Sequence, residues 1–215
     1  VVTDVELNSL FKYGFVVLKR SKKYWTSLGI DLKKVQGIVE NEIGSFEFKP
    51  DSYRKIDHTY RYEKGTNRLS NLLARNKVFY PFINIPDILF CVYKVLGKKF
   101  RLSSLGMREP LKGAGHQGLH IDWLQRKTNI SQFFQVSAFI LLDKVTKHNG
   151  APRIIPQSHE KLVNVKSTSE FKYKRKPSDH ILLEKEDNLN SKYMTGSMGD
   201  IIILNVNALL IIKPP

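Results

Sequence analysis

The stretch DIIILNVNALLII, residues 200–212, is the longest apolar run in the chain and the best guide to its fold class. It is shorter than the about 20 apolar residues that a helix needs to span a membrane, and Asn205 and Asn207 interrupt it. A short run rich in isoleucine that follows a glycine-containing turn favours a buried β-strand. We therefore predict one strand or two consecutive strands here, and no membrane span.

The rest of the chain divides into a helical part and a part with short strands. Helical spacing of apolar residues predicts helices at residues 5–13, 31–44, 67–76 and 85–97, and the sequence FVVLK predicts an early strand at 15–19. Later segments that resemble strands lie at 100–109, 119–122, 133–143 and 153–156. Helices followed by strands indicate an α+β fold whose strands form a sandwich or barrel. We predict a single domain over residues 1–215, mainly helical in 1–98 and with a β core in 99–215.

Composition and charge restrict the partners. The chain has 215 residues and a formal net charge of +15, and its basic residues are scattered along the sequence. Strongly basic proteins bind nucleic acid, anionic membranes or anionic small molecules. No recognition helix and no aromatic pattern typical of RNA-binding domains accompanies the charge. A lysine-rich solvated surface is therefore the favoured interpretation, and an anionic small-molecule substrate is the alternative.

The single cysteine, Cys91, lies in an apolar helical pattern and is expected to be buried. One cysteine allows no internal disulfide, which fits a reducing compartment. The first ten residues carry no basic segment followed by an apolar one, so they do not resemble a secretory signal. We expect a cytoplasmic protein.

A candidate metal site lies in HQGLHIDW, residues 116–123. If LHID is extended, residues two apart lie on the same face, which brings His120 and Asp122 together. Nitrogen and carboxylate oxygen donors suit Fe(II), Mn or Zn. On the triplet alone, the alternative of a His–Asp hydrogen bond within a strand stays open.

His116 precedes His120 by four residues, so the two would share a face only on a helix. Glycines at positions 113, 115 and 118 make a helix unfavourable there. We therefore expect His116 to lie in a loop and not to bind a metal.

Three sequence segments, which follow one another along the chain, add to this candidate site. They are YGFVVLKR at 13–20, QGLHIDW at 117–123 and LLDKVTKHNGAPRIIPQSH at 141–159. Together they resemble the phytanoyl-CoA dioxygenase family of Fe(II)/2-oxoglutarate oxygenases, over about residues 5–207. The resemblance implies a double-stranded β-helix of the jelly-roll type with N-terminal helices outside it. It also implies Fe(II) and 2-oxoglutarate as cofactors, O₂ as co-substrate and a small-molecule substrate.

The resemblance implies roles for five residues. His120 and Asp122 match the first two members of the 2-His-1-carboxylate triad and would be the catalytic metal ligands. Gln117 matches a position that contacts 2-oxoglutarate. Arg108 and Arg153 would bind an anionic group of the cofactor or substrate, although a structural role for Arg153 stays open.

Other histidines are expected to lie outside the metal site, and His159 in the PQSH turn matches a family position that is not a ligand. Halogenating relatives lack the carboxylate that Asp122 provides. Hydroxylation, desaturation or cyclisation of a C–H bond, with succinate and CO₂ as co-products, is therefore the expected reaction.

The chain departs from the family where the third ligand is due. No histidine follows His180 and no arginine follows Arg175, so a distal ligand and a 2-oxoglutarate-binding arginine are both lacking. Either the site is degenerate, or a segment is absent between about Ala208 and Leu209. We expect the second, because an apolar run without turn residues between two paired antiparallel strands is unusual. Smaller departures are Pro152 for threonine and Gln157 for glycine.

Two other functions remain as alternatives. The charge of +15 would suit a nucleic-acid dealkylase of the same chemistry. The lacking third ligand would suit a non-catalytic β-helix binding protein with a degenerate metal site.

Overall fold

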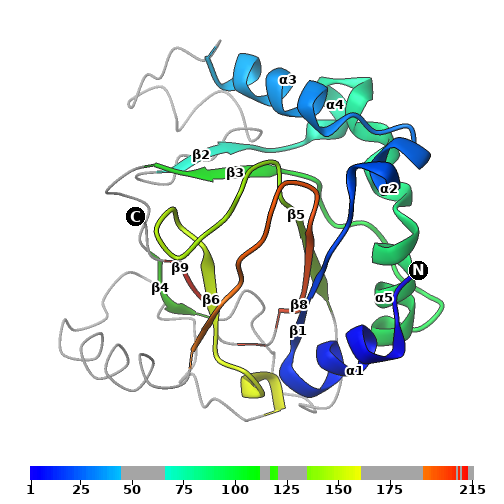
Figure 1. Ribbon diagram of the computed structural model, residues 1–215, viewed down its shortest axis with the longest axis vertical. Helices are drawn as coiled ribbons and strands as arrows, with labels where there is room; N and C mark the ends of the chain where they lie inside the picture. The colour runs from blue at the N-terminus through cyan, green and yellow to red at the C-terminus, as the bar shows by residue number, and fades with distance from the viewer. Residues whose placement is uncertain are drawn as a thin grey trace.

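The structure is a computed structural model that describes residues 1–44, 66–111, 117–120, 135–160, 191–206, 208 and 210–212. Helices dominate the first half and strands the second (Figure 1). The elements in chain order are α1 (Asp4–Tyr13), β1 (Phe15–Leu18), α2 (Lys22–Ser27), α3 (Leu32–Gly44), β2 (Thr66–Leu69), α4 (Leu72–Arg75), η2 (Lys77–Asn84), α5 (Pro86–Leu96), β3 (Met107–Pro110), β4 (Gln117–His120), β5 (Val136–Ile140), β6 (Pro152–Ile154), η3 (Ser158–Glu160), β7 (Lys192–Tyr193), β8 (Ile201–Asn205) and β9 (Leu210–Ile212).

Strand β8 is the centre of the fold. It pairs antiparallel with β1 on one side and with β5 on the other. Ile201 and Ile203 pack in a core with the helices, whereas Ile202 and Leu204 pack in a second core on the opposite face. All five β8 residues are buried because both faces of this strand are covered. The prediction of a buried strand in the longest apolar run is confirmed.

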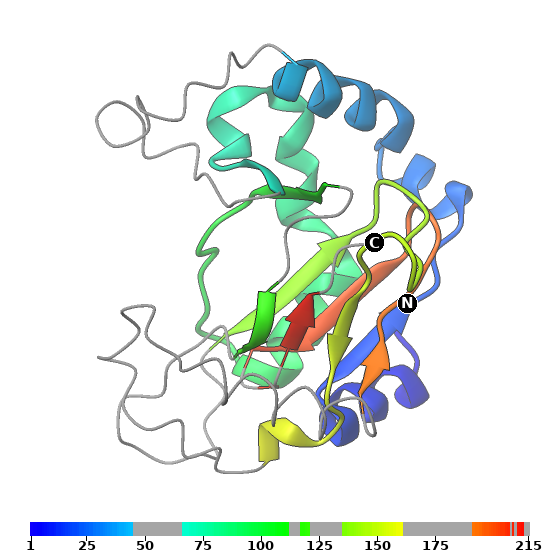
Figure 2. The same cartoon turned by 90° about the vertical axis from the view of Figure 1, so that its left-hand side faces the viewer.

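A second sheet has the strand order β4-β9-β6-β7. Ile154 of β6 and Met194 pack with Ile202 and Leu204 of β8, so the two sheets share one hydrophobic core. Helices α1, α2 and α5 cover the other face of the β1-β8-β5 sheet. The order of layers is therefore helices, three-stranded sheet and four-stranded sheet, which Figures 1 and 2 show from two sides. The α+β prediction is confirmed.

Strands β8 and β9 belong to different sheets. We expected a segment to be missing between Ala208 and Leu209 because we assumed that these two strands pair with each other. That assumption is wrong. Strand β8 ends at Asn205 and β9 begins at Leu210, and between them Val206 and Ala208 are both fully buried. Burial of these two positions favours apolar residues over turn formers. The absence of a segment itself stays a prediction.

Local signals set the helix ends where they were predicted. Thr3 and Glu6 form a capping box at the start of α1, and Gly14 ends that helix with a φ of 82°. Asp31 accepts hydrogen bonds from the first backbone N–H groups of α3. Helix α5 buries Cys91 completely, and burial raises the pKa of this thiol to about 11. The expected burial of Cys91 is confirmed.

The predicted helix at residues 67–76 is wrong in its first half. Residues 66–69 form strand β2, which pairs antiparallel with β3, and only 72–75 are helical. Leu69 of β2 packs in a third core with Val35 and Val39 of α3. Strand pairing and this burial outweigh the weak helical pattern. The strand predicted from residue 100 begins only at Met107.

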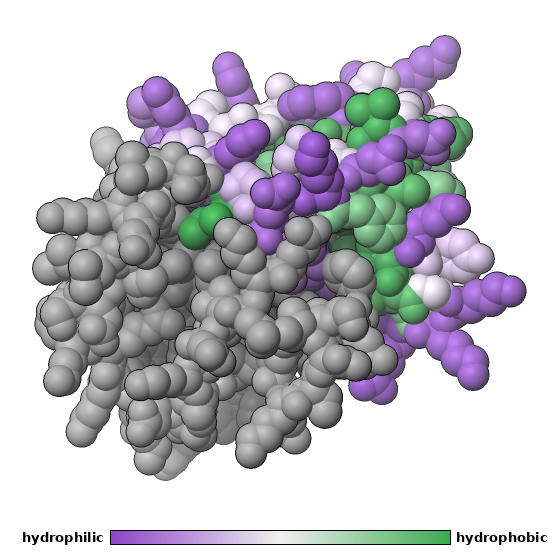
Figure 3. Space-filling view, turned by 90° about the horizontal axis from the view of Figure 1, so that it is seen from below, coloured by the Kyte–Doolittle hydropathy of each residue, from purple (hydrophilic) through white to green (hydrophobic). Residues whose placement is uncertain are grey.

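Hydrophilic side chains surround a band of hydrophobic ones on the face seen in Figure 3. Exposed hydrophobic residues include Phe90 and Tyr93 on the outer face of α5. Within the described part of the chain, no single helix has the length and apolar character of a membrane span. Only η2 and α5 together do, and they are bent by 48°.

Candidate metal and co-substrate site

Strand β4 carries the first part of the predicted site. Gln117 begins β4 and His120 ends it, and β9 is the strand that pairs with β4. Asp122 and His116 lie outside the described residues. The prediction that His120 and Asp122 share a face therefore stays a prediction, as does the loop position of His116.

A register shift brings two of the predicted residues to equivalent positions. Gln117 pairs with Ile212 and His120 pairs with Leu210, so three residue steps in β4 match two in β9. Residues two apart in β9 share a face, and directly paired residues also share a face. Gln117 and His120 consequently lie on one face of the sheet, although an odd spacing in a regular strand would separate them. Such bulges are frequent next to active sites.

The row that contains His120 runs across three strands. Leu210 pairs with His120 in β4 and with Ile154 in β6. Ile154 is fully buried in the core between the two sheets. Because paired residues share a face, positions 120 and 210 lie on the inner face of this sheet, toward β8. The register therefore puts position 120 on the same face of the sheet as the buried Ile154.

Arg153 lies on the opposite face of the same sheet, because it alternates with Ile154 along β6. It is 3% exposed, its guanidinium bonds to Ser191 Oγ, and it lies 5.2 Å from the ring centre of Tyr193. These contacts join β6 to Tyr193 of β7 and to Ser191, the residue just before β7. The structural role left open for Arg153 is the one that its position supports.

Arg108 lies in a different sheet from His120. In the β2–β3 pair it stands directly opposite Arg68. Both side chains are half-buried, and each takes part in other interactions of the fold. The sequence did not single out Arg68, because it lies in the segment 67–76 that was predicted to be a helix. The anion-binding role of Arg108 stays a prediction.

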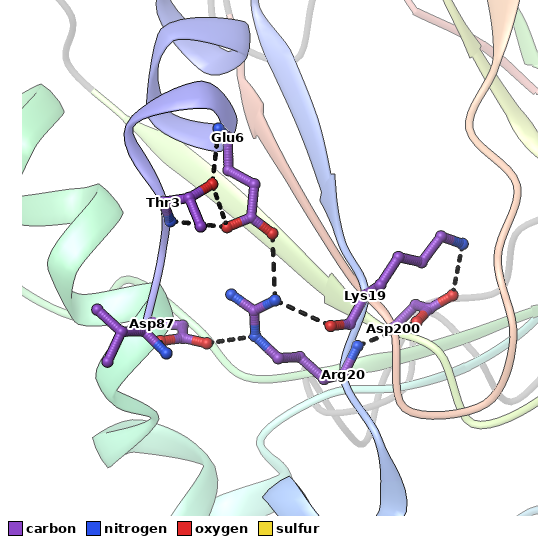
Figure 4. A network of polar contacts seen from close by, with 7 residues as sticks. Thr3, Glu6, Lys19, Arg20, Asp87 and Asp200 are labelled. Atoms are coloured by element: carbon purple, nitrogen blue, oxygen red, sulfur yellow. Dashed lines mark hydrogen bonds and ion pairs between the residues drawn. The ribbon is translucent and has the colours of Figure 1, made fainter.

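Asp200 holds the turn before β8 in place (Figure 4). Its carboxylate accepts hydrogen bonds from Ser197 N at 2.8 Å, Arg20 N at 3.2 Å and Lys19 Nζ at 2.8 Å. Burial alone would raise the pKa of this carboxyl, but the hydrogen bonds lower it below 3.8. The Gly-Asp pair at 199–200 is thus an anchor between β1 and β8.

A second ionic group lies beside this anchor (Figure 4). The Arg20 guanidinium bonds to Asp87 of α5 and, at 3.2 Å, to Glu6 of α1. Asp87 is 3% exposed. Burial and the nearby Asp87 charge raise the pKa of Tyr24 to about 12. The group joins two helices to the end of β1 and lies on the helical side of the three-stranded sheet, away from His120.

His159 also has a structural position. It is 5% exposed, and its Nε2 donates to the Phe11 carbonyl at 2.9 Å. Gly14 leaves room for the imidazole, since a Cβ at position 14 would lie 2.6 Å from Nδ1. These contacts give His159 a structural role, and its exclusion from the ligand set stays a prediction.

A facial triad needs three protein ligands on one face. Across β9 and β6, the positions paired in a row with His120 are Leu210 and Ile154, and neither residue type has a donor atom in its side chain. Among the described residues, no group of three His, Cys, Asp or Glu side chains could hold a metal ion. Asp122 lies outside the described residues, so His120 and Asp122 as metal ligands stay a prediction.

Solved structures share this fold. HygX from Streptomyces hygroscopicus, with nickel and 2-oxoglutarate bound, is 16% identical with a TM-score of 0.68, over 100% of this chain and 81% of that chain. EctD from S. alaskensis with bound Fe is 16% identical with a TM-score of 0.67, over 99% and 71%. The 2-oxoglutarate-dependent epimerase SnoN from nogalamycin biosynthesis is 12% identical with a TM-score of 0.62, over 98% and 76%.

Sequence comparison gives a more specific result. No curated protein sequence matches the chain. The model of one family, described as phytanoyl-CoA dioxygenase (PhyH), matches residues 51–209, which is most of the chain. This range includes both the H-x-D triplet and the NGAPRIIPQSH block. The chain belongs to the phytanoyl-CoA dioxygenase family.

Proposed function

We propose that the protein is a non-haem Fe(II)- and 2-oxoglutarate-dependent dioxygenase that oxidises a C–H bond of a small molecule. The observation that carries this proposal is the position of His120. It ends an edge strand on the inner face of the four-stranded sheet, at the start of an H-x-D triplet, in a chain of the dioxygenase family. We further propose that the two packed sheets form a double-stranded β-helix.

His120 and Asp122 would hold the metal. Iron and 2-oxoglutarate, when bound, would supply the activation of O₂: one oxygen atom would enter succinate as CO₂ is lost from 2-oxoglutarate, and the other would oxidise the substrate C–H bond. The register shift puts positions 117 and 120 on one face of the sheet, which supports the proposal that the Gln117 amide donates to a carboxylate of 2-oxoglutarate. Arg108, opposite Arg68, would bind an anionic group of cofactor or substrate. We assign Arg153 a structural role.

The substrate class follows from charge and from the relatives. HygX has a structure with hygromycin B, and SnoN has one with nogalamycin RO, so proteins of this fold bind small molecules. The charge of +15 favours a substrate with an anionic group. The single buried Cys91 suits a cytoplasmic, reducing setting.

A succinate-release assay with Fe(II) and a panel of anionic small molecules tests the function. We expect succinate from the wild-type protein and none from Asp122→Ala. Asp143→Ala, a change at an exposed carboxylate, is the control and should keep full turnover. Unchanged succinate release from Asp122→Ala would contradict the assignment of that ligand.

The incomplete ligand set favours a second candidate, a non-catalytic binding protein with the same fold. It would bind 2-oxoglutarate or a related dianion without turnover. Binding of the dianion, together with no succinate from any member of the panel at saturating Fe(II), would favour this candidate over the enzyme.

A further inference from the structure

We infer that the outer side of helix α5 and the segment that follows it bind the surface of an anionic phospholipid membrane. We call this region the α5 surface. It consists of Phe90, Tyr93 and Lys94 on α5 and of residues 98–102. The inference goes beyond the proposed oxygenase function and does not depend on it, because it uses no residue of the candidate site.

Helix α5 is apolar on two sides. Its inner side packs Cys91, with Ile88 and Val95, in the core that the helices share with the three-stranded sheet. Its outer side carries Phe90 and Tyr93, which are 38% and 43% exposed. A helix on the surface of a globular protein normally turns charged and polar residues outward. The outer side of α5 therefore has the composition of a contact surface.

The segment after α5 continues this surface at the outer edge of the helical layer (Figure 1). Residues 98–102, with the sequence KKFRL, are all exposed. Phe100 and Leu102 follow basic side chains there, and they are 40% and 55% exposed. Single exposed apolar residues need no explanation, but a group of them edged by charged residues marks an interaction surface.

The charge of the α5 surface is positive. Between positions 86 and 102 the chain has one acidic residue, Asp87, and four basic residues, which are Lys94, Lys98, Lys99 and Arg101. Asp87 is 3% exposed and bonds to Arg20 on the inner side of the helix. Within residues 86–102, all of which the structure describes, no carboxylate is exposed. Four cations complement an anionic partner and repel a second copy of this chain.

Apolar side chains next to lysines suit the interface of a lipid bilayer. Helices that lie in this interface place Phe, Trp or Leu toward the acyl chains and Lys or Arg at the headgroups. Lys94 has this position relative to Phe90, because its Nζ lies 5.3 Å from the centre of the Phe90 ring. A long lysine side chain covers apolar surface in this way while its ammonium group stays in the polar layer.

The neighbouring helix adds a second observation. Together, η2 and α5 have the length and apolar composition of a membrane span, but they are bent by 48°. Phe79 of η2 and Cys91 of α5 are buried in protein cores. The protein therefore holds these helices on one side and leaves the other side for lipid. The α5 surface thus contacts the headgroup layer without crossing the bilayer.

Sedimentation of the full chain with vesicles tests the inference. We expect binding to vesicles of phosphatidylcholine mixed with phosphatidylserine, weaker at high salt, and little binding to phosphatidylcholine alone. Lys98→Gln/Lys99→Gln should weaken binding by about 20- to 30-fold, because each basic residue near an anionic membrane contributes about five-fold. Lys144→Gln/Lys147→Gln is the matched control. It removes two exposed charges between β5 and β6 and should change binding little.

Tryptophan fluorescence tests whether the apolar side chains enter the membrane. Tyr93→Trp should show a shift of its emission to shorter wavelength when the mixed vesicles are added. Tyr193→Trp is the matched control, because Tyr193 of β7 is 42% exposed and lies outside the α5 surface. It should show no shift.

Three results would overturn the inference. The first is the absence of binding to the mixed vesicles. The second is equal weakening by the two lysine pairs, or equal emission shifts of the two tryptophan variants, since the α5 surface would then not be the contact. The third is binding of a single-stranded RNA oligonucleotide that Lys98→Gln/Lys99→Gln loses, without binding to vesicles, which would assign this surface to nucleic acid.

Discussion

Arg108 and Arg68 stand directly opposite each other in the antiparallel β2–β3 pair. Both side chains are half-buried in the strand pair, and each takes part in other interactions of the fold. The arrangement was hidden in the sequence, because Arg68 lies in a segment with a helical pattern and forty residues separate the two arginines.

Arg108→Gln should weaken the binding of 2-oxoglutarate or of an anionic substrate. Loss of one charge-assisted hydrogen-bonding group costs about 1.5–3 kcal/mol, which corresponds to roughly 10- to 100-fold in the dissociation constant. Calorimetry of the Ni(II)-loaded protein measures the effect. Arg101→Gln removes the same charge at an exposed position and should change binding little. Equal effects of the two variants would mean that only net charge matters.

Asp200→Asn should destabilise the fold at neutral pH by about 1.5–3 kcal/mol, the range for hydrogen bonds to a charged group. The lowered pKa of Asp200 means that its contribution is present above the ordinary carboxyl pKa of 3.8 and disappears as the pH falls through the lower folded value. Urea unfolding at pH 7 and near pH 3 measures this. The difference between wild type and variant should shrink at the acid end.

Asp143→Asn is the matched control for Asp200→Asn. Asp143 is exposed and accepts one hydrogen bond from Gln36, which an asparagine oxygen can also accept. Its stability should match that of the wild type at both pH values. A loss for Asp200→Asn that did not depend on pH would point to packing instead of charge.

Gly14→Ala should destabilise the protein more than Gly29→Ala does. Both glycines have a left-handed φ, which costs about 1–2 kcal/mol for alanine. A Cβ at position 14 would also lie 2.6 Å from His159 Nδ1, whereas nothing lies within 4 Å of one at position 29. Overpacking adds about 1–3 kcal/mol at position 14 only. Equal losses of stability in thermal unfolding would show that His159 moves away from the added Cβ without an energetic cost.

Gln157→Gly should stabilise the protein by about 0.5–1 kcal/mol. Gln157 has a φ of 65°, which glycine adopts without strain, and this gain is partly offset by the larger entropy of glycine in the unfolded chain. Chemical denaturation measures the gain. Gln157→Ala removes the same side chain but keeps the strained conformation, so it should give no gain. Equal stabilisation by both variants would assign the effect to the side chain.

Local patterns predicted much of the fold correctly. The isoleucines of 201–203 form a strand that is buried on both faces, Gly14 ends the first helix, and Cys91 lies inside. These features depend on residues close together in the chain, where periodicity and capping act. The same kind of reasoning failed at residues 66–69, because a partner strand forty residues away decides their conformation.

The sequence by itself determined the family, the H-x-D triplet and the lack of a later histidine. Only the tertiary structure decided which residue lies beside His120. Register between β4 and β9 joins segments about ninety residues apart, and a shift of one residue would exchange the two faces of β9. That register places Leu210 opposite His120 and turns Arg153 to the other face. Neither position follows from local periodicity, because pairing between distant strands is set by the packing of the whole sheet.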